Sequence, residues 1–552
     1  MIDPKNNLQP GQVYGRSSTA RDYIMSNRFR TVGLSFLAIL LSIIVAVSYV
    51  GIPLDSIIVP LVVLFLFFLP IVMWRYPKMT AYTVFGAVCL IEVLPTFSTD
   101  ALTDRIPFFW NINYIFQLYL HANVKAIPLN VFETLVLLAG FMSLLRAVYT
   151  KSFNLQTGRL IWPIGIYVAF VGLGWFHGMV TGGDFKDSLQ EVRSQIYLLV
   201  AYLMAVNVFS ERKSGQILLW TLGISMGIKG FLYTFRRYVT LHGLPIPDQG
   251  VGSHEEAFLF DCAMMLLVVL GITRSMPKLK TVLWMLLPLI LLGDLACNRR
   301  AGTAAIIIAI PIVFAAAYRA LPNRRRLIGI LGVVVPVLFY AYFLAFRHSD
   351  AIYAQPARAV ESQYNPDPRD LSSNLYRDAE NADIMATIKL EPLLGYGYGK
   401  RMLHAYPIAD ISKTYPWWDL IPHNSVFWVW MRVGSLGFIS FWMMVSAIII
   451  TACQTAGRSD LETDEKAVCL LSIGAICMLT IFGLLDLQVS NFRDTLFVGL
   501  MAGAVDAILI RKLREAALAN PASVLPFWQR NQRLVPLSNR AAALISRGNG
   551  AS

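Results

Sequence analysis

Long apolar runs recur along nearly the whole chain, and they limit what it can fold into more than any other feature. A helix that crosses about 30 Å of hydrocarbon needs about 20 mostly apolar residues. About 14 runs in this chain approach that length, so they predict an all-α polytopic membrane protein with about 14 transmembrane helices. The runs fall near 33–52, 56–74, 79–97, 129–146, 160–180, 194–210, 214–233, 255–273, 281–297, 301–318, 327–346, 424–452, 466–485 and 494–510.

The composition agrees with a membrane location. Of the 552 residues, 56% are hydrophobic and 15% are charged, whereas soluble domains carry about 25% charged residues. A polar tail of about 30 residues precedes the first run, which is therefore expected to act as an uncleaved anchor rather than as a signal peptide.

The six cysteines are scattered and form no Cys-x-x-Cys motif. Most of them lie inside apolar runs, so they are expected to pack as small apolar side chains rather than to form disulfides. The sequence contains no evident cluster of metal ligands, and neither a metal nor a cofactor is expected.

A net charge of +13 raises the question of nucleic-acid binding, but the positions of the charges argue against it. If the N-terminal tail is cytoplasmic, about 28 of the 47 basic residues fall in the tails and in alternate loops on the inner side. This bias orients membrane helices. The pattern therefore predicts both termini in the cytoplasm and no nucleic-acid partner.

One long polar segment interrupts the apolar runs and is predicted to be a helical insertion on the outer side. Within it, residues 373–390 carry apolar side chains at helical spacing, with Ser373 as the N-cap and Pro392 as the stop signal. The predicted organisation is a cytoplasmic N-tail at 1–30, transmembrane helices 1 to 11 at 31–346, an outer loop domain at 347–422, transmembrane helices 12 to 14 at 423–512, and a cytoplasmic C-tail at 513–552.

A glycine-rich turn, with glycines at 395, 397 and 399, follows the predicted outer helix. Alternating glycines let backbone N–H groups converge on an anion, although a plain tight turn has the same composition. The aromatic segment at 415–418 also has two interpretations: its rings stack on sugars, or they lie in the lipid headgroup layer.

Several arginines stand on the outer side, next to apolar runs. Arg193 precedes the run at 194–210, and Arg299 and Arg300 occupy a short turn between two runs. Basic residues at these places oppose the preference of lysine and arginine for the cytoplasmic side. Charged side chains placed next to a span at a cost in free energy are usually functional or paired with an opposite charge. We expect these arginines either to bind a ligand or to pair with carboxylates such as Asp294 or Asp184.

His423 and Asn424 stand where the apolar run at 424–452 begins. They either cap the following helix only, or they place an imidazole that exchanges a proton near neutral pH. Clustered guanidinium groups suit phosphate because each donates two parallel hydrogen bonds. Together with a histidine that accepts a proton from a sugar hydroxyl, they predict metal-free transfer from a lipid diphosphate.

The motifs of the outer segments occur in a characteristic order. They are VR at 192–193, NRRAG at 298–302, Arg377, PLLGYG at 392–397, and His423-Asn424 followed by Gly434 and Gly437. In this order and spacing they resemble the O-antigen ligase/polymerase superfamily of bacterial membrane glycan transferases. The resemblance covers residues 193–437.

The resemblance implies a GT-C-like helical fold, a glycan donor linked to undecaprenyl diphosphate, and metal-independent transfer at the periplasmic face of the bacterial inner membrane. It implies that Arg193 and Arg300 hold the diphosphate, with Arg299 as a rival to Arg300, and that His423 orients or deprotonates the acceptor hydroxyl. The chain departs from the common pattern in its larger number of predicted spans and in Arg432, where an acidic residue is frequent. Supporting roles are implied for Arg377, Asn424, Gly395, Gly397, Gly434 and Gly437.

Three functions remain open at this point. A ligase, which we favour, transfers the glycan to a sugar of lipid A–core, whereas a repeat-unit polymerase of O-antigen, capsule or exopolysaccharide transfers it to another lipid-linked repeat. A transporter or flippase would need basic residues inside the spans, and only Lys229 and Arg432 are placed there. The expected partners are the lipid-linked donor, the glycan or lipid A–core acceptor and membrane lipids, with a chain-length regulator protein as a further candidate.

Overall fold

The computed structural model describes residues 69–519, with gaps at 94–102, 104–105, 107, 121–128, 151–154, 243–250 and 414. The predicted N-tail, the predicted span at 33–52, most of the span at 56–74 and most of the C-tail lie outside the described residues. Within the described residues the regular structure is helical, with one isolated antiparallel bridge between Asn111 and Asn130.

Each predicted apolar run that falls within the described residues corresponds to a helix. The α-helices are α3 Pro77–Leu90, α4 Ile112–Leu120, α5 Val131–Thr150, α6 Ile161–Val180, α7 Phe185–Val208, α8 Arg212–Phe235, α9 His254–Thr273, α10 Pro277–Cys297, α11 Arg300–Ala320, α12 Arg325–Phe346, α13 Gln355–Glu361, α14 Pro368–Leu390, α15 Ser425–Ala456, α16 Thr463–Gly483 and α17 Phe492–Ala519.

Nine helices in the described part of the chain are long and apolar enough to cross a membrane. They are α5, α6, α8, α9, α10, α11, α12, α15 and α16. The predicted all-α polytopic membrane protein is therefore confirmed, whereas the number 14 stays a prediction. Helices α3, α7 and α17 are not among these nine helices. Helix α3 is only 14 residues long, and α7 and α17 each contain several charged residues.

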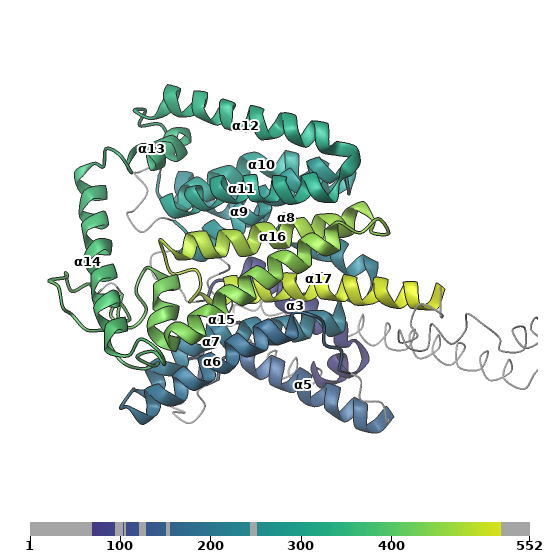
Figure 1. Cartoon of the computed structure of the whole chain (residues 1–552), viewed down its shortest axis with the longest axis horizontal. Coiled ribbons are helices and arrows are strands. Elements are labelled where there is room, and N and C mark those ends of the chain that lie inside the picture. The colour runs from purple at the N-terminus through teal and green to yellow at the C-terminus, as the bar shows by residue number, and fades with distance from the viewer. Residues whose placement is uncertain are drawn as a thin grey trace, which may run out of the picture.

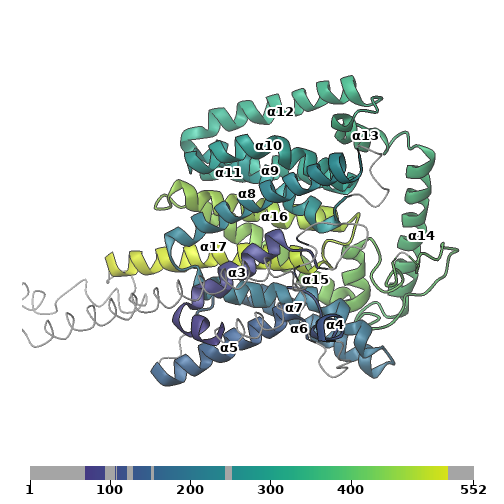
Figure 2. The same ribbon diagram turned by 180° about the vertical axis from the view of Figure 1, so that it is seen from behind.

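Most helices run side by side along one common direction, and α14 lies across their ends (Figures 1 and 2). Helices α12 and α5 lie at opposite edges of this bundle in both views. Within α12, apolar side chains such as Val333, Val337 and Leu338 are more than half exposed. An apolar surface of this kind is stable against hydrocarbon, so it agrees with a lipid-facing edge.

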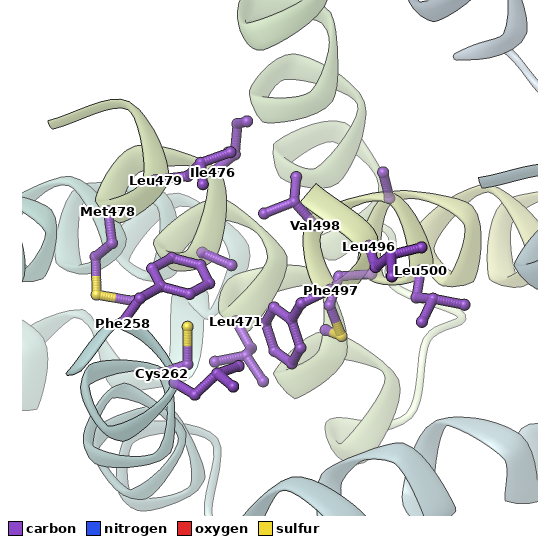
Figure 3. Packing of buried hydrophobic residues seen from close by; sticks show 14 of the residues in the cluster. Phe258, Cys262, Leu471, Ile476, Met478, Leu479, Leu496, Phe497, Val498 and Leu500 are labelled. Atoms are coloured by element: carbon purple, nitrogen blue, oxygen red, sulfur yellow. The ribbon is translucent and has the colours of Figure 1, made fainter. Parts of the chain in front are cut away.

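The centre of the bundle is close-packed where α9, α16 and α17 meet. Phe258 and Cys262 of α9 lie against Leu471 of α16 and Phe497 of α17 (Figure 3). Two glycines of α17, Gly499 and Gly503, allow it to approach α7 closely, because a Cβ at either position would lie within 2.6 Å of a backbone oxygen of α7. Small residues four apart are a common way for membrane helices to pack.

The polar insertion predicted for the outer side contains α13, α14 and a long loop that leads to α15. The predicted helix at 373–390 exists and ends at Leu390 as expected, but its predicted beginning is wrong. Helix α14 begins at Pro368, and the side chain of Asp367, not that of Ser373, caps it by accepting a hydrogen bond from the backbone N–H of Asp370 at 2.7 Å. A proline in the first turn after an aspartate cap suits a helix start, because proline lacks the N–H that would be left unsatisfied there.

Candidate functional site

Helices α9, α11, α15 and α17 all begin at the end of the bundle that α14 crosses (Figure 1). A cavity of about 440 Å³ lies there, between α14 and the starts of α11 and α15. The polar side chains that line it include Arg300, Gln363, Tyr364, Asn374, Arg377, Asp378, Glu380, Asn381, His423 and Asn424. We call this space the arginine cavity.

His423 is held by a buried carboxylate of α14. The backbone N–H of His423 donates to Oε2 of Glu380 at 3.0 Å, and Nδ1 of the ring lies 3.1 Å from Oε1 of the same carboxylate. Glu380 is 1% exposed, so it keeps one geometry. Because an ionised carboxylate only accepts hydrogen bonds, Nδ1 carries the proton and Nε2 remains an acceptor.

The same carboxylate changes the proton affinity of the imidazole. Burial lowers the pKa of His423, but the hydrogen bond and the negative charge of Glu380, assisted by the charge of Asp486, outweigh burial. The pKa of His423 is therefore raised above its ordinary value, because these groups stabilise the imidazolium form. A histidine tuned in this way holds a proton more firmly once it has accepted one.

Asn424 performs the capping role that the sequence suggests. Its Oδ1 accepts a hydrogen bond from the backbone N–H of Phe427 at 3.0 Å, which satisfies one free donor at the start of α15. Its Nδ2 donates to Oδ1 of Asn381 on α14 at 3.0 Å. The residue therefore joins α15 to α14, and the neighbouring His423 is placed in the cavity by the same contact.

Two arginines reach the arginine cavity. Nη1 of Arg300, the first residue of α11, lies 3.0 Å from Oγ of Ser362 and 3.0 Å from Oδ2 of Asp370. Its carboxylate partner is therefore Asp370 of α14, and not Asp294 or Asp184. Arg377 lies one helical turn before Glu380 on α14 and lines the same cavity.

Arg299 and Arg193 are placed elsewhere. Arg299, the N-cap of α11, does not line the cavity, and its charge acts on Asp486. Nε of Arg193 on α7 lies 2.8 Å from Oε1 of Glu133 on α5, in a pair that also accepts a hydrogen bond from Tyr197. Of the three predicted arginines, Arg300 lines the cavity together with His423, Arg299 acts on Asp486, and Arg193 pairs with Glu133.

The glycine-rich turn packs against α6 and α15. Gly395, Gly397 and Gly399 have φ angles between 79° and 85°, which favour glycine, and a Cβ at Gly397 would lie 2.6 Å from Cα of Gly178. Four N–H groups of the turn, those of Gly395, Tyr396, Tyr398 and Gly399, donate within the protein, and that of Gly399 donates to the carboxylate of Glu191 at 2.6 Å. The structure therefore favours the tight turn over an open anion cradle.

Helix α15 breaks at Gly434, where φ is 68° and ψ is −178°. The break is close-packed, because a Cβ at Gly434 would lie 2.2 Å from the carbonyl oxygen of Leu393. One turn on, a Cβ at Gly437 would lie 2.5 Å from Cβ of Val433. Both glycines therefore have a packing role near the glycine-rich turn.

Arg432, the departure from the family pattern, has a structural partner. Its Nε lies 2.6 Å from Oε1 of Glu191, and both side chains are fully buried. Its two terminal nitrogens donate to the carbonyl oxygens of Gly397, Lys400 and Leu420 at 2.7 to 2.8 Å. This arginine holds the loop between α14 and α15 on the bundle.

Several residues that contact the candidate site residues were not predicted from the sequence. Glu380 could have been found, because it lies three positions after Arg377 and therefore on the same face of a predicted helix. Asp370 lies outside the predicted helix boundary and was missed with it. The contact between His254 and Asp486, whose Nδ1 and Oδ2 are 2.6 Å apart, joins residues 232 positions apart and has no signal in the sequence.

Fold and site together describe a polytopic membrane protein with a polar, arginine-containing cavity at one end of its helix bundle. A family model described as O-antigen ligase matches residues 285–442, which contain Arg300, Arg377 and His423. The O-antigen ligase of Salmonella typhimurium is 22% identical over 319 residues, which cover 53% of this chain and 72% of that protein. Both matches support the O-antigen ligase/polymerase superfamily. They also support a glycosyltransferase-like enzyme with a membrane glycan ligase or polymerase role.

Proposed function

We propose that the protein is a membrane glycosyltransferase of the O-antigen ligase type, which transfers a glycan from undecaprenyl diphosphate to a sugar of lipid A–core. The observation that carries the proposal is the arginine cavity, where Arg300, Arg377 and the His423–Glu380 pair line one space. The matching family model and the Salmonella relative are both described as O-antigen ligases, which supports the ligase over the polymerase.

The diphosphate is expected to bind at Arg300 and Arg377. Both are guanidinium groups, which keep their charge at any physiological pH and match phosphate oxygens geometrically. Helices α11 and α15 start at the cavity, and neither has an acidic residue in its first turn. Their N-terminal N–H groups and dipoles therefore add positive potential where the leaving group gains negative charge.

In the reaction, a hydroxyl oxygen of the acceptor attacks the anomeric carbon of the donor sugar. A glycosidic bond forms, the bond from the anomeric carbon to the phosphate oxygen breaks, and the lipid diphosphate leaves with the electron pair. Nε2 of His423 takes the proton of the attacking hydroxyl, and Glu380 stabilises the imidazolium that results. We propose that the arginines supply the positive charge that a metal ion supplies in other glycosyltransferases.

We further propose that the protein lies in the bacterial inner membrane with both termini in the cytoplasm and the arginine cavity at the periplasmic face. The family and the charge distribution of the loops support this orientation. In this orientation residues 347–422 form a periplasmic loop domain, and the donor reaches it from the outer leaflet.

A transporter is disfavoured by the partners of the two basic residues inside the helices. Lys229 of α8 pairs with Glu92 and Glu256, and Arg432 of α15 pairs with Glu191. Both are fully buried. Charges neutralised in this way hold helices together and do not present a path to a passing glycan.

The direct test is transfer by the purified full-length protein in liposomes that contain the lipid-diphosphate glycan and lipid A–core. We expect release of free lipid diphosphate together with a glycosylated core. His423→Ala and Arg300→Ala should abolish both products, whereas Arg347→Ala, which removes an arginine of the same end that does not line the cavity, should not. Movement of intact donor across the bilayer without any new bond would overturn the proposal, and lengthened lipid-linked chains in place of a glycosylated core would identify a polymerase.

A further inference from the structure

A second cavity lies beside the arginine cavity and has no part in the chemistry described so far. It measures about 190 Å³ and lies between the end of α3, the start of α9 and the loop that leads into α17. The aromatic segment at 415–418 contributes Tyr415 and Trp417 to its lining. From the sequence, these rings were expected either to stack on sugars or to lie in the lipid headgroup layer. We call this space the aromatic cavity.

The lining combines aromatic rings with carboxylate and amide groups. Tyr233, Tyr415, Trp417 and Phe492 supply the rings, and Glu92, Gln190, Glu255 and Asn491 supply the polar groups. Sugar rings have C–H faces that pack on aromatic faces, whose quadrupole is negative, and hydroxyl groups that donate to carboxylates and amides. A sugar ring presents both kinds of surface in one small ligand.

One carboxylate oxygen of the cavity lining, Oε2 of Glu92, has no hydrogen-bond donor among the described residues. Glu92 is 4% exposed, and its Oε1 accepts hydrogen bonds from Lys229, Thr103 and Tyr233. Its Oε2 is buried and, among the described residues, has no hydrogen-bond partner. A buried carboxylate oxygen without a donor is costly, and the hydroxyl of a ligand in the cavity would satisfy it.

The two cavities share a wall. Leu484 and Leu485 line the arginine cavity, and Leu487 lines the aromatic cavity. Asp486 lies between them and is anchored from both sides. Its carboxylate contacts His254 of the aromatic cavity, and its backbone carbonyl accepts a hydrogen bond at 2.8 Å from Oγ of Ser425, two residues after His423.

Electrostatics agrees with this position of Asp486. Burial raises the pKa of its carboxyl, but the neighbouring His254 and the charges of Arg377 and Arg299 outweigh burial and hold the pKa well below its usual range. A ligand in the aromatic cavity is therefore only one short segment away from the groups that would react.

We propose that the aromatic cavity is a carbohydrate subsite, which binds one uncharged sugar ring of the substrate glycan next to the reacting bond. The inference rests on the proposed function and deepens it. The volume is below the roughly 300 Å³ of the smallest drug-sized pockets, so it suits one ring and not a longer chain. Among the described residues the lining contains neither lysine nor arginine, so a phosphate or a uronic acid would find no cation in it, which favours a neutral sugar.

The ring can belong to the donor glycan or to the acceptor, and binding experiments distinguish the two. The probes are the repeat-unit oligosaccharide released from its lipid by mild acid and the core oligosaccharide released from lipid A, each titrated calorimetrically into the full-length protein in detergent. We expect one of the two to bind and Trp417→Ala to weaken that binding about ten-fold, because one aromatic face is lost. Trp417→Phe should retain most of the affinity, since it keeps a face.

The matched control is Trp162→Ala, because Trp162 is 75% exposed on α6 and lines neither cavity. Equal binding by Trp417→Ala and the wild-type protein would overturn the subsite, as would failure of both oligosaccharides to bind the wild-type protein. Glu92→Gln gives an independent check, with an expected loss of about ten-fold for the same oligosaccharide. Binding that depends on Trp417 in a protein without transfer activity would reject the proposed function and retain the subsite, whereas transfer with unchanged binding would do the reverse.

Discussion

The two cavities at the α14 end of the bundle lie side by side and differ in charge. Arg300 and Arg377 line the first together with Asp378 and Glu380, and Glu380 is committed to His423. The second has Glu92 and Glu255 and, among the described residues, neither lysine nor arginine in its lining. The difference separates two recognition tasks, because a diphosphate needs cations and a neutral sugar needs acceptors and ring faces.

The helix starts show the same division. Helices α11 and α15 begin at the arginine cavity without an acidic residue in the first turn. Helices α9 and α17, which begin beside the aromatic cavity, carry Glu255, Glu256 and Asp494 there. Carboxylates in a first turn cancel the positive end of the helix dipole. Among these four helices, the dipoles left uncompensated are the two at the arginine cavity, where an anion is expected to bind.

The largest effect should come from His423→Ala, because the histidine is assigned to the chemical step and not to binding. We expect transfer to fall on the order of 10³-fold, as is usual for loss of a general base. His177→Ala is the matched control, since His177 pairs with Glu391 outside both cavities. The measurement is the rate of lipid-diphosphate release, with thermal unfolding to show that both variants fold, and an active His423→Ala protein would remove the base from the mechanism.

The next largest effect tests the division between the cavities directly. Inorganic diphosphate should inhibit transfer, and Arg377→Ala should raise its inhibition constant on the order of 100-fold, because a charged hydrogen-bond partner is lost. Trp417→Ala should leave this constant unchanged. The comparison fails if the tryptophan variant weakens diphosphate inhibition as much as the arginine variant does.

Glu380→Gln should lower the rate about ten-fold and also change its pH dependence. The carboxylate stabilises the imidazolium of His423 and so raises its pKa. Without that charge the pKa falls, the neutral base persists to lower pH, and the acidic limb of the rate profile moves to lower pH. A slower enzyme whose acidic limb stays in place would indicate that Glu380 is only structural.

The smallest effect concerns the carboxylate that competes for Arg300. Asp370→Asn removes the ion pair with Arg300, in which both side chains are about one-fifth exposed. Pairs of this kind contribute little to stability, so the fold should persist while inorganic diphosphate inhibits about two- to five-fold more strongly. Weaker inhibition would mean that Asp370 positions Arg300 for its ligand.

Much of this arrangement could be predicted from the sequence, because apolar runs, polar insertions and short motifs are local. Arg300 and His423 stand at the ends of predicted helices and Arg377 lies within one, and all three line one cavity. Arg299 and Arg300 could not be separated in the same way. Their side chains diverge because Arg299 is the extended N-cap and Arg300 is the first helical residue, and that boundary is not visible in the doubled arginine.

Contacts between residues that lie far apart in the chain could not be predicted from the sequence. The pair of Arg193 and Glu133 joins α7 to α5, so an arginine next to a span has an intramolecular partner that no nearby motif indicates. The aromatic cavity likewise combines residues 92, 254, 417 and 491, which come together only when the helices pack. The sequence alone does not distinguish stacking on sugars from a place in the headgroup layer, because the position of Glu92 in the same lining as Trp417 depends on how the helices pack.

The break of α15 at Gly434 has a mechanical consequence. It leaves the carbonyl of Met431 to accept the N–H of Tyr396 at 2.7 Å and the N–H of Ser435 to donate to the carbonyl of Pro392 at 2.9 Å. A membrane helix and an extramembrane segment are thereby fastened at one level by two backbone bonds, and sliding either past the other would expose both groups in a buried place. Under the proposed function, the interrupted helix itself would therefore set the depth of the imidazole relative to the bilayer, and a sugar hydroxyl would have to be presented at that one height to react.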